Sequence, residues 1–314
     1  MPYPKTTKAV HIGDLHFWHI SLNPWNYRGK RFLGMGNLIV NRRRKFRREL
    51  GSLIVERVRE IDPAWALFSG DLSTTALGAE FQQALKVFRP LEKTLAGGLR
   101  VVPGNHDRYS PSDIRDKRFE QFLGNWCGKE HRWPWFERLA EDLWCVGIDG
   151  TTSNGLGSFG RIRPATLESL RNWWKQARGR VKALWVVCHF PPEEPLEAPS
   201  HGAGVTLRND SDLVEVLGSF DIPVFFMHGH LHYRWLYRSP TAPNVVYVNA
   251  GAPLMRHGSH APDLGFFELD WDGEQTRVTM HTGELANFEW SSAAVELPGA
   301  SEYKNLQDRA EKFE

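Results

Sequence analysis

Short apolar runs of strand length alternate with helical stretches along most of this chain. Each run is rich in Val, Ile, Phe or Trp and ends in glycine or a polar residue, which is typical of buried β-strands. Helical periodicity occurs at 41–60, 78–89 and 164–178. This alternation predicts a layered α/β fold. The predicted strands are Ala9 to Gly13, Trp65 to Gly70, Leu99 to Gly104, Trp144 to Gly150, Ala183 to His189, Val224 to Gly229 and Val245 to Ala250.

After residue 264 the sequence pattern changes to one that predicts antiparallel strands. Two apolar segments, 265–271 and 276–281, flank Asp272-Gly273, a pair that favours a hairpin turn. Residues 302–314 are rich in charge, and we expect a peripheral helix or a frayed end there. Since no repeat or linker-like segment interrupts the chain, we expect one domain over 1–298, with a hairpin at 264–283 and a charged tail at 299–314.

Overall composition narrows the functional class only slightly. The net charge is +2 over 314 residues, so no partner follows from it. Cys127, Cys145 and Cys188 form no CxxC pair, which is typical of a reducing compartment. The chain shows no signal-peptide segment and no run of about 18 apolar residues that would span a bilayer. We therefore expect a cytoplasmic protein, either free or peripheral on the inner face of a membrane.

Five polar blocks follow the apolar runs, at the strand ends where open α/β sheets place their sites. They are Asp14-Leu15-His16, Gly70-Asp71, Gly104-Asn105-His106-Asp107, His189-Phe190-Pro191-Pro192 and Gly229-His230-Leu231-His232. Side chains two residues apart point to one side of a strand, so the two outer blocks each direct a pair of ligand-type side chains to one centre. Gly70 allows the tight turn that lets a carboxylate approach a cation.

Each block alone has an ordinary structural explanation, as a strand end, a turn or a polar loop. All five occur in one chain, however, and Asp, Asn and His side chains together are suitable ligands for Mn, Fe, Zn or Co. Two such cations about 3.5–4 Å apart activate water and clamp phosphoryl oxygens. The combination therefore predicts a two-metal centre that hydrolyses a phosphate ester.

In this order, the five blocks resemble the motifs of the calcineurin-like metallophosphoesterases, and the resemblance covers residues 9–251. It implies an α/β fold of four layers, an αββα sandwich in which two mixed sheets are flanked by helices. Relatives often carry two adjacent histidines where this chain has His189-Phe190, a departure that removes no ligand. The implied ligands are Asp14, His16, Asp71 and His232 for one metal, and Asp71, Asn105, His189 and His230 for the other.

The same resemblance implies catalytic roles for His106 and Asp107. His106 would donate a proton to the leaving group or stabilise its charge, and Asp107 would orient His106. The implied activity is hydrolysis of a phosphodiester or pyrophosphate bond through a metal-bridging hydroxide. The cofactors would be two divalent ions, Mn, Fe or Zn, and we expect manganese to support activity.

A basic and aromatic segment at 17–50, the cap segment, separates the first two blocks. Nine Lys or Arg residues and no acidic residue fall between Arg28 and Arg48. One interpretation is a solvated helix face, and another is an amphipathic cap that contacts an anionic substrate or an anionic membrane. Nucleic acid is disfavoured because no recognised binding fold is present. Candidate substrate contacts are Arg28, Arg31 and Arg108, although a surface charge is an equal interpretation for Arg108.

Several substrates and one non-enzymatic role stay open. Part of the cap segment resembles bacterial relatives that act on UDP-2,3-diacylglucosamine, a lipid A precursor, as pyrophosphohydrolases, and other relatives are cyclic-nucleotide phosphodiesterases. The partner would be a phosphorylated small molecule or a lipid nucleotide. A catalytically silent binding module, as in the retromer subunit of this fold, is disfavoured because such proteins lose ligands that this chain keeps. The oligomeric state does not follow from the sequence.

Overall fold

The computed structural model describes residues 2–27, 29–128, 132–152, 159–198, 207–257, 261–287 and 289–307. The strands are β1 (Thr7–Ile12), β2 (Trp65–Phe68), β3 (Gly98–Val101), β4 (Trp135–Arg138), β5 (Leu143–Ile148), β6 (Ala183–Cys188), β7 (Val224–His228), β8 (Arg234–Arg238), β9 (Val245–Ala250), β10 (Phe266–Trp271), β11 (Thr276–Glu284), β12 (Glu289–Val295) and β13 (Tyr303–Asn305). The helices are α1 (Lys30–Asn37), α2 (Arg43–Lys45), α3 (Gly51–Ile61), α4 (Gly78–Phe88), α5 (Pro111–Arg115), α6 (Arg118–Leu123), α7 (Pro164–Ala177) and α8 (Asp210–Gly218). Short helical turns are η1 (Pro24–Tyr27), the π-helical η2 (Leu38–Arg42), η3 (Arg48–Leu50), η4 (Arg89–Lys93) and η5 (Gly124–Trp126).

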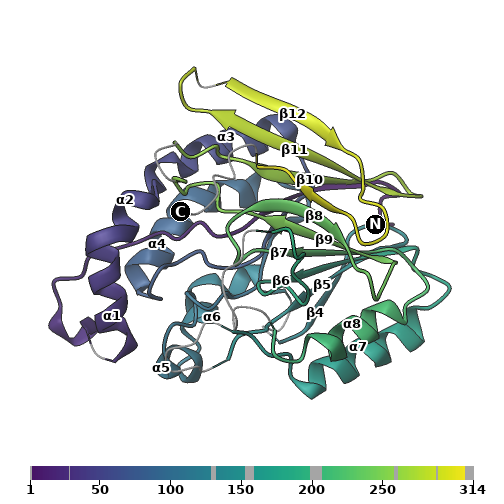
Figure 1. The fold of residues 1–314 in the computed structure, drawn as a ribbon, viewed down its shortest axis with the longest axis horizontal. Helices are drawn as coiled ribbons and strands as arrows, with labels where there is room; N and C mark the ends of the chain where they lie inside the picture. The colour runs from purple at the N-terminus through teal and green to yellow at the C-terminus, as the bar shows by residue number, and fades with distance from the viewer. Residues whose placement is uncertain are drawn as a thin grey trace.

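Two mixed sheets pack against each other, and helices cover their outer faces (Figure 1). One sheet has the strand order β12-β11-β10-β1-β2-β3, and the other has the order β13-β8-β9-β7-β6-β5-β4. Helices α3 and α4 lie on the first sheet, whereas α7 and α8 lie on the second. This arrangement confirms the predicted αββα sandwich.

Three apolar layers hold the sandwich together. The inner layer joins the two sheets and includes Leu67 from β2, Trp185 from β6 and Phe225 from β7. The outer layers place Phe68 against α3 and α4, and Val186 against α7 and α8. Both faces of the central strands are therefore buried, which explains why they are continuous apolar runs in the sequence instead of alternating ones.

Parallel pairing brings the ends of the central strands to one edge of the sandwich. β1, β2 and β3 are parallel neighbours in the first sheet. In the second sheet, β5, β6, β7 and β9 are parallel neighbours. Parallel strands end at a common edge, so the segments that follow β1, β2, β3, β6 and β7 meet there.

The predicted helices at 78–89 and 164–178 are confirmed by α4 and α7. The predicted continuous helix at 41–60 is wrong, because the chain leaves the helical conformation at Phe46 and resumes it in α3. Phe46 has an extended backbone (φ −98°, ψ 114°) and is buried with its ring 4.5 Å from that of His16. Burial of this phenylalanine beside the site therefore interrupts the helix that the periodicity predicts.

The C-terminal region adds strands to both sheets. β10 and β11 pair antiparallel around the Asp272-Gly273 turn. Within the predicted tail, the described residues 302–307 do not form the expected helix, because 303–305 form β13 along the edge of β8, and residues 308–314 lie outside the described residues. The Tyr303 ring lies 6.2 Å from that of Trp235, and the side chain of Gln307 accepts a hydrogen bond from the backbone N–H of Arg234. These contacts fix the described part of the tail on the sheet.

The cap segment lies at one side of the sandwich, where α1 and α2 project from the sheets (Figure 1). Its inner side chains, Met35 and Leu38, form a small apolar cluster with Leu77. Throughout the ranges that the structure describes, no helix combines the length and apolarity needed to cross a bilayer. The cap segment is thus a partly packed appendage of the first sheet, adjacent to the common strand edge.

Candidate metal centre

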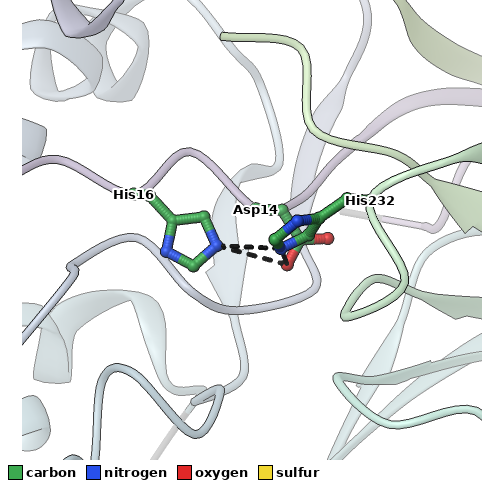
Figure 2. A group of neighbouring side chains, drawn as sticks. All are labelled: Asp14, His16 and His232. Carbon is green, nitrogen blue, oxygen red and sulfur yellow. Dashed lines mark hydrogen bonds and ion pairs between the residues drawn. The ribbon is translucent and has the colours of Figure 1, made fainter. Parts of the chain in front are cut away.

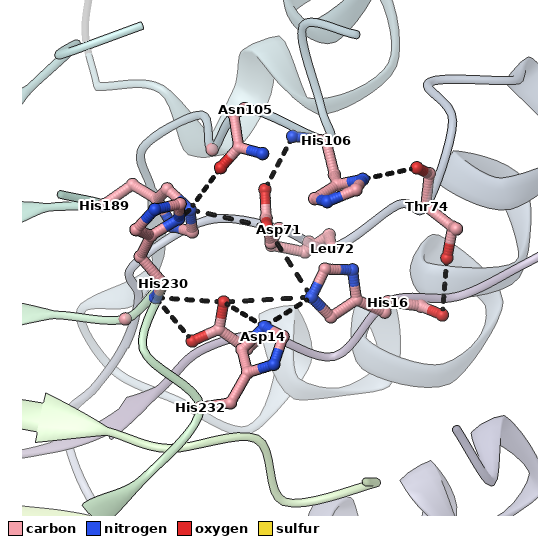
Figure 3. Close-up of polar contacts among 12 residues, drawn as sticks. Asp14, His16, Asp71, Leu72, Thr74, Asn105, His106, His189, His230 and His232 are labelled. Carbon is pink, nitrogen blue, oxygen red and sulfur yellow. Dashed lines mark hydrogen bonds and ion pairs between the residues drawn. The ribbon is translucent and has the colours of Figure 1, made fainter. Parts of the chain in front are cut away.

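The five polar blocks converge at the common strand edge (Figure 3). The side chains predicted as ligands lie within the first few residues after β1, β2, β3, β6 and β7. Asp14, His16, Asp71 and His189 are buried, whereas Asn105, His230 and His232 are partly exposed. The cluster is consequently open to solvent on the side formed by the last three residues. Its members are Asp14, His16, Asp71, Asn105, His106, His189, His230 and His232.

Unusual backbone conformations direct several of these side chains inward. Five of the ten non-glycine residues with positive φ in the described chain are predicted ligands. Such conformations cost roughly 1–3 kcal/mol each and persist only where the surroundings impose them. Backbone hydrogen bonds help to impose them here, from Asp14 N to Gly70 O (3.1 Å) and from His16 N to Asp71 O (2.9 Å). The five are Asp14 (φ 50°), His16 (46°), Asp71 (53°), His230 (74°) and His232 (61°).

One group of ligand atoms comes from Asp14, His16 and His232 (Figure 2). The Nε2 atoms of the two histidines are 3.1 Å apart. Asp14 Oδ1 is 3.9 Å from Nε2 of His16 and 3.7 Å from Nε2 of His232. Two imidazole nitrogens and a carboxylate oxygen therefore face a common point, which is the donor set that a divalent transition metal prefers.

A second group surrounds His189. Its Nε2 atom lies 3.0 Å from Asn105 Oδ1, 3.2 Å from His230 Nδ1 and 3.4 Å from Asp71 Oδ2. Asp71 Oδ2 is also 3.6 Å from Nε2 of His16, a member of the first group. The Asp71 carboxylate thus stands between the two groups (Figure 3).

The chemistry of this second group fits a cation. Nδ1 of His189 lies 2.8 Å from the backbone carbonyl of Ser69, which only accepts, so Nδ1 carries the proton. In the neutral imidazole, Nε2 then presents a lone pair toward the oxygens of Asn105 and Asp71. Acceptor atoms that face one another at about 3 Å repel unless a positive charge lies between them, so these residues fit a metal ion.

The pKa values of the ligand-type side chains also indicate that the cluster lacks positive charge. Burial alone would lower the pKa of His189, but the neighbouring Asp71 carboxylate raises it to about 9. Burial opposes ionisation of Asp71, yet His189 and His106 hold the pKa of this carboxyl well below its ordinary value. Burial, aided by the nearby Asp71 charge, raises the pKa of Asp14 well above its ordinary value. Without cations, His189 thus supplies positive charge that stabilises the Asp71 carboxylate, while a second carboxylate at Asp14 is disfavoured.

Two glycines allow the carboxylates to approach the opposing loops. A Cβ atom at Gly104 would lie 2.1 Å from Oδ1 of Asp71, and one at Gly229 would lie 2.4 Å from Oδ2 of Asp14. Cβ atoms essentially never approach other heavy atoms this closely. The glycines of the third and fifth blocks are therefore required by the site itself.

The loop that contains Thr74 fixes the tautomer of His106. Nδ1 of His106 lies 2.6 Å from the carbonyl oxygen of Thr74, so Nδ1 carries the proton and donates to it. Burial, together with the charge of Arg42, lowers the pKa of His106 to about 3. His106 Nε2 is thus the ring atom available to a ligand. An anionic substrate beside the ring would favour its protonation.

Asp107 holds the loops of the site instead of the ring of His106. Its buried carboxylate accepts hydrogen bonds from the backbone N–H groups of Ser73 (2.9 Å) and Gly104 (3.0 Å) and from the Ser73 hydroxyl (2.9 Å). The orienting contact predicted for Asp107 is made by the carbonyl of Thr74, because the Asp107 side chain is occupied by these donors. Asp107 therefore joins the second block to the third.

Of the arginines predicted to contact the substrate, the two that the structure describes do not face the metal ligands. Arg108 is buried and forms ion pairs with Glu120 (2.5 Å) and Asp149 (3.1 Å), so it is neither a surface charge nor directed at the metal ligands. Arg31 pairs with Asp113 and donates to the carbonyl of Thr75 (3.0 Å). Both guanidinium groups are occupied by internal partners. Arg28 lies outside the described residues.

Two other cations approach the site from the cap segment. Nη1 of Arg42 lies 3.2 Å from Nδ1 of His106. The Lys30 amine lies 5.0 Å from the ring centre of Tyr109, which in turn packs 5.5 Å from the ring of His106. The sequence pattern alone did not distinguish these two from the other seven basic residues between Arg28 and Arg48. The available signal was helical spacing, since Arg42 follows the buried Met35 and Leu38 at intervals of three to four residues.

Comparison with known proteins agrees with this description. The model of the calcineurin-like phosphoesterase family matches residues 7–234. A dimetal phosphatase from Danio rerio has 14% identity and a TM-score of 0.58, with 92% of this chain and 98% of that chain covered. The purple acid phosphatase PPD1 from yellow lupin has 12% identity and a TM-score of 0.57, with 93% of this chain and 55% of that chain covered.

At these identities, the two structures show a shared fold, and this chain spans about half the length of the lupin protein. No curated protein matches the chain by sequence. The family match is more informative, because residues 7–234 contain all five polar blocks and more than two thirds of the chain. On the strength of this match, the chain belongs to the calcineurin-like phosphoesterase family.

Proposed function

We propose that this protein is a binuclear metal-dependent phosphoesterase that hydrolyses a phosphodiester or pyrophosphate bond. The observation that carries the proposal is the position of Asp71. Its Oδ2 atom is 3.6 Å from a histidine of the first ligand group and 3.4 Å from a histidine of the second. One carboxylate shared by two groups of mixed oxygen and nitrogen donors is the arrangement that a pair of divalent cations requires.

In this proposal, Asp71 belongs to both metal sites. Asp14, His16 and His232 complete the first, and Asn105, His189 and His230 complete the second. When bound, the two cations, for which we propose manganese, iron or zinc, activate a water molecule and neutralise charge on the phosphoryl oxygens. The partly exposed residues Asn105, His230 and His232 mark the side from which a substrate would enter.

The chain's own residues would then act on the leaving group. His106, held by Thr74 through Nδ1, presents Nε2 and would pass a proton to the departing oxygen once protonated. Asp107 keeps His106 in place indirectly, because it clamps the loop that carries it. Arg42 and Lys30 would contact anionic oxygens of the substrate. A pyrophosphate or diester offers a second substituent on phosphorus for the side chains of Arg42 and Lys30 to contact, which favours such substrates over a simple monoester.

Several finer alternatives belong to the same proposal. A lipid nucleotide such as UDP-2,3-diacylglucosamine would use the basic cap segment, whereas a cyclic nucleotide would need only the centre itself. A silent binding module is the rival from another class, and the close approach of seven ligand-type side chains weighs against it. We also propose a cytoplasmic location, supported by three cysteines that are buried and unpaired.

The test is hydrolysis of bis(p-nitrophenyl) phosphate with added Mn²⁺, followed by a panel of a lipid nucleotide, a cyclic nucleotide and a monoester. Asp71→Asn should abolish activity and reduce bound metal. His106→Ala should retain metal but lose most turnover. Asp221→Asn is a matched control, because Asp221 is exposed and lies before β7, at the opposite end from His230. Full activity in Asp71→Asn would refute the proposal.

A further inference from the structure

The cap segment exposes an apolar surface. Of the eight large apolar side chains that are exposed in the described ranges, six belong to this segment. Isolated exposed apolar residues are ordinary, but a concentration of this kind marks an interaction site. We name these six residues the cap surface: Leu22 (96% exposed), Trp25 (65%), Phe32 (64%), Leu33 (60%), Ile39 (38%) and Val40 (73%).

The helix from α1 through η2 is apolar on two opposite sides. Gly34, Met35 and Leu38 are buried on the side that packs against the body of the protein. Phe32, Leu33, Ile39 and Val40 recur at helical spacing on the exposed side. A helix that covers a globular protein normally has a polar outer side. The outer side of this helix is therefore apolar, although a polar surface is expected there. It has no packing partner in the described part of the structure.

The charge around the cap surface indicates which kind of partner it would bind. Arg43, Arg44 and Lys45 are exposed in α2, three to five residues after Val40. The stretch from Arg28 to Arg48 carries nine basic residues and no acid. An apolar face bordered by Lys and Arg is the pattern of a helix that lies in the interface of an anionic bilayer, with its apolar side chains among the acyl chains.

We propose that the cap segment docks this protein on an anionic lipid bilayer through the cap surface. A second copy of the chain is a poorer occupant, because two such surfaces face to face would bring Arg43, Arg44 and Lys45 of both copies together. Nucleic acid would use the basic residues but would leave Leu22, Ile39 and Val40 in water. A bilayer with anionic headgroups satisfies both the apolar and the basic residues.

Docking would place the catalytic region near the lipid. Arg42, which approaches His106, lies on the inner side of the same helical stretch whose outer side carries Val40. One helix, about 10 Å in diameter, would therefore separate the metal centre from the membrane surface. The docking inference stands on the cap surface alone and holds for any substrate of the centre.

The direct test is sedimentation with vesicles at low ionic strength. The protein should bind vesicles of phosphatidylcholine with phosphatidylglycerol and should bind pure phosphatidylcholine vesicles at least about tenfold more weakly. Salt should weaken binding to the anionic vesicles. Absence of binding to anionic vesicles at low salt would overturn the inference, as would a stable dimer that dissociates when Val40→Ser is introduced.

Matched variants separate the two contributions. Phe32→Ser with Val40→Ser, and Arg43→Glu with Arg44→Glu, should each reduce vesicle binding at least about tenfold. The controls are Leu196→Ser, a fully exposed leucine outside the cap segment, and Arg171→Glu with Lys175→Glu on α7, all of which should bind as the unchanged protein does. If either pair of cap variants bound anionic vesicles as tightly as the unchanged protein, the proposal would be contradicted.

A label reports insertion independently of activity. A Val40→Cys variant can be labelled with an environment-sensitive fluorophore because the three native cysteines are buried. Its emission should shift to the blue on anionic vesicles, whereas that of labelled Leu196→Cys should not. Asp71→Asn should bind vesicles fully, and the cap variants should still hydrolyse a water-soluble diester. Failure of docking and failure of the proposed activity are thereby distinguished.

Discussion

Gly104→Ala should disable the metal centre by displacing a single carboxylate. The added Cβ would lie 2.1 Å from Oδ1 and 2.6 Å from N of Asp71, whereas ordinary van der Waals contact begins at 3.4 Å. Asp71 must therefore move by about 1.3 Å, the difference between 3.4 and 2.1 Å. Since Asp71 stands between both ligand groups, neither can keep its geometry. A misplacement of about 1 Å costs on the order of 100-fold in rate, or about 2.7 kcal/mol of transition-state stabilisation.

The assay is kcat/KM for a chromogenic diester, together with metal content and thermal unfolding. We expect Gly104→Ala to fall at least about 100-fold in kcat/KM and to lose metal, while unfolding as a single transition. Gly36→Ala is the control, because Gly36 is exposed in α1 with open space where its Cβ would lie. It should keep full activity and be more stable by up to about 1 kcal/mol. Wild-type activity and metal content in Gly104→Ala would refute the reasoning.

Three further substitutions test neighbouring parts of the account. Arg42→Met should raise the KM of an anionic substrate about tenfold or more without loss of metal, whereas Arg43→Met should not; equal KM values would remove Arg42 from the site. Arg108→Met should lower the free energy of unfolding by about 3–5 kcal/mol, measured in urea, because the buried Asp149 and the partly buried Glu120 lose their cation; a raised KM at unchanged stability would instead make Arg108 a substrate contact. Phe46→Ala should cost about 3–5 kcal/mol and weaken metal binding, since its ring packs on His16; metal affinity equal to that of the exposed-site control Leu33→Ala would contradict this.

The meeting of the five polar blocks was predictable because it depends on local patterns. Each block follows an apolar run, and parallel strands end at a common edge. Gly70 and Gly104 preceded the groups that need close approach, so even the tight turns had a local signal. Most of the strands and the layered fold follow from the same periodicity.

Other features depend on contacts between distant segments and could not be predicted in this way. Phe46 interrupts a regular helical pattern because it packs on His16, thirty residues earlier in the chain. Arg108 directly follows the third block, but its partners Glu120 and Asp149 come from separate parts of the chain. The charged residues around Tyr303 gave no sign that the free edge of β8 would receive a strand.

The central claim is that one chain holds two metal ions that share Asp71. The most direct measurement is the metal stoichiometry of the purified protein after reconstitution with Mn²⁺, by elemental analysis, on the same samples used for diester hydrolysis. We predict about two ions per chain. Asp71→Asn should hold fewer ions and be inactive. Full hydrolytic activity with one ion or none per chain, or two tightly bound ions in Asp71→Asn, would contradict the account.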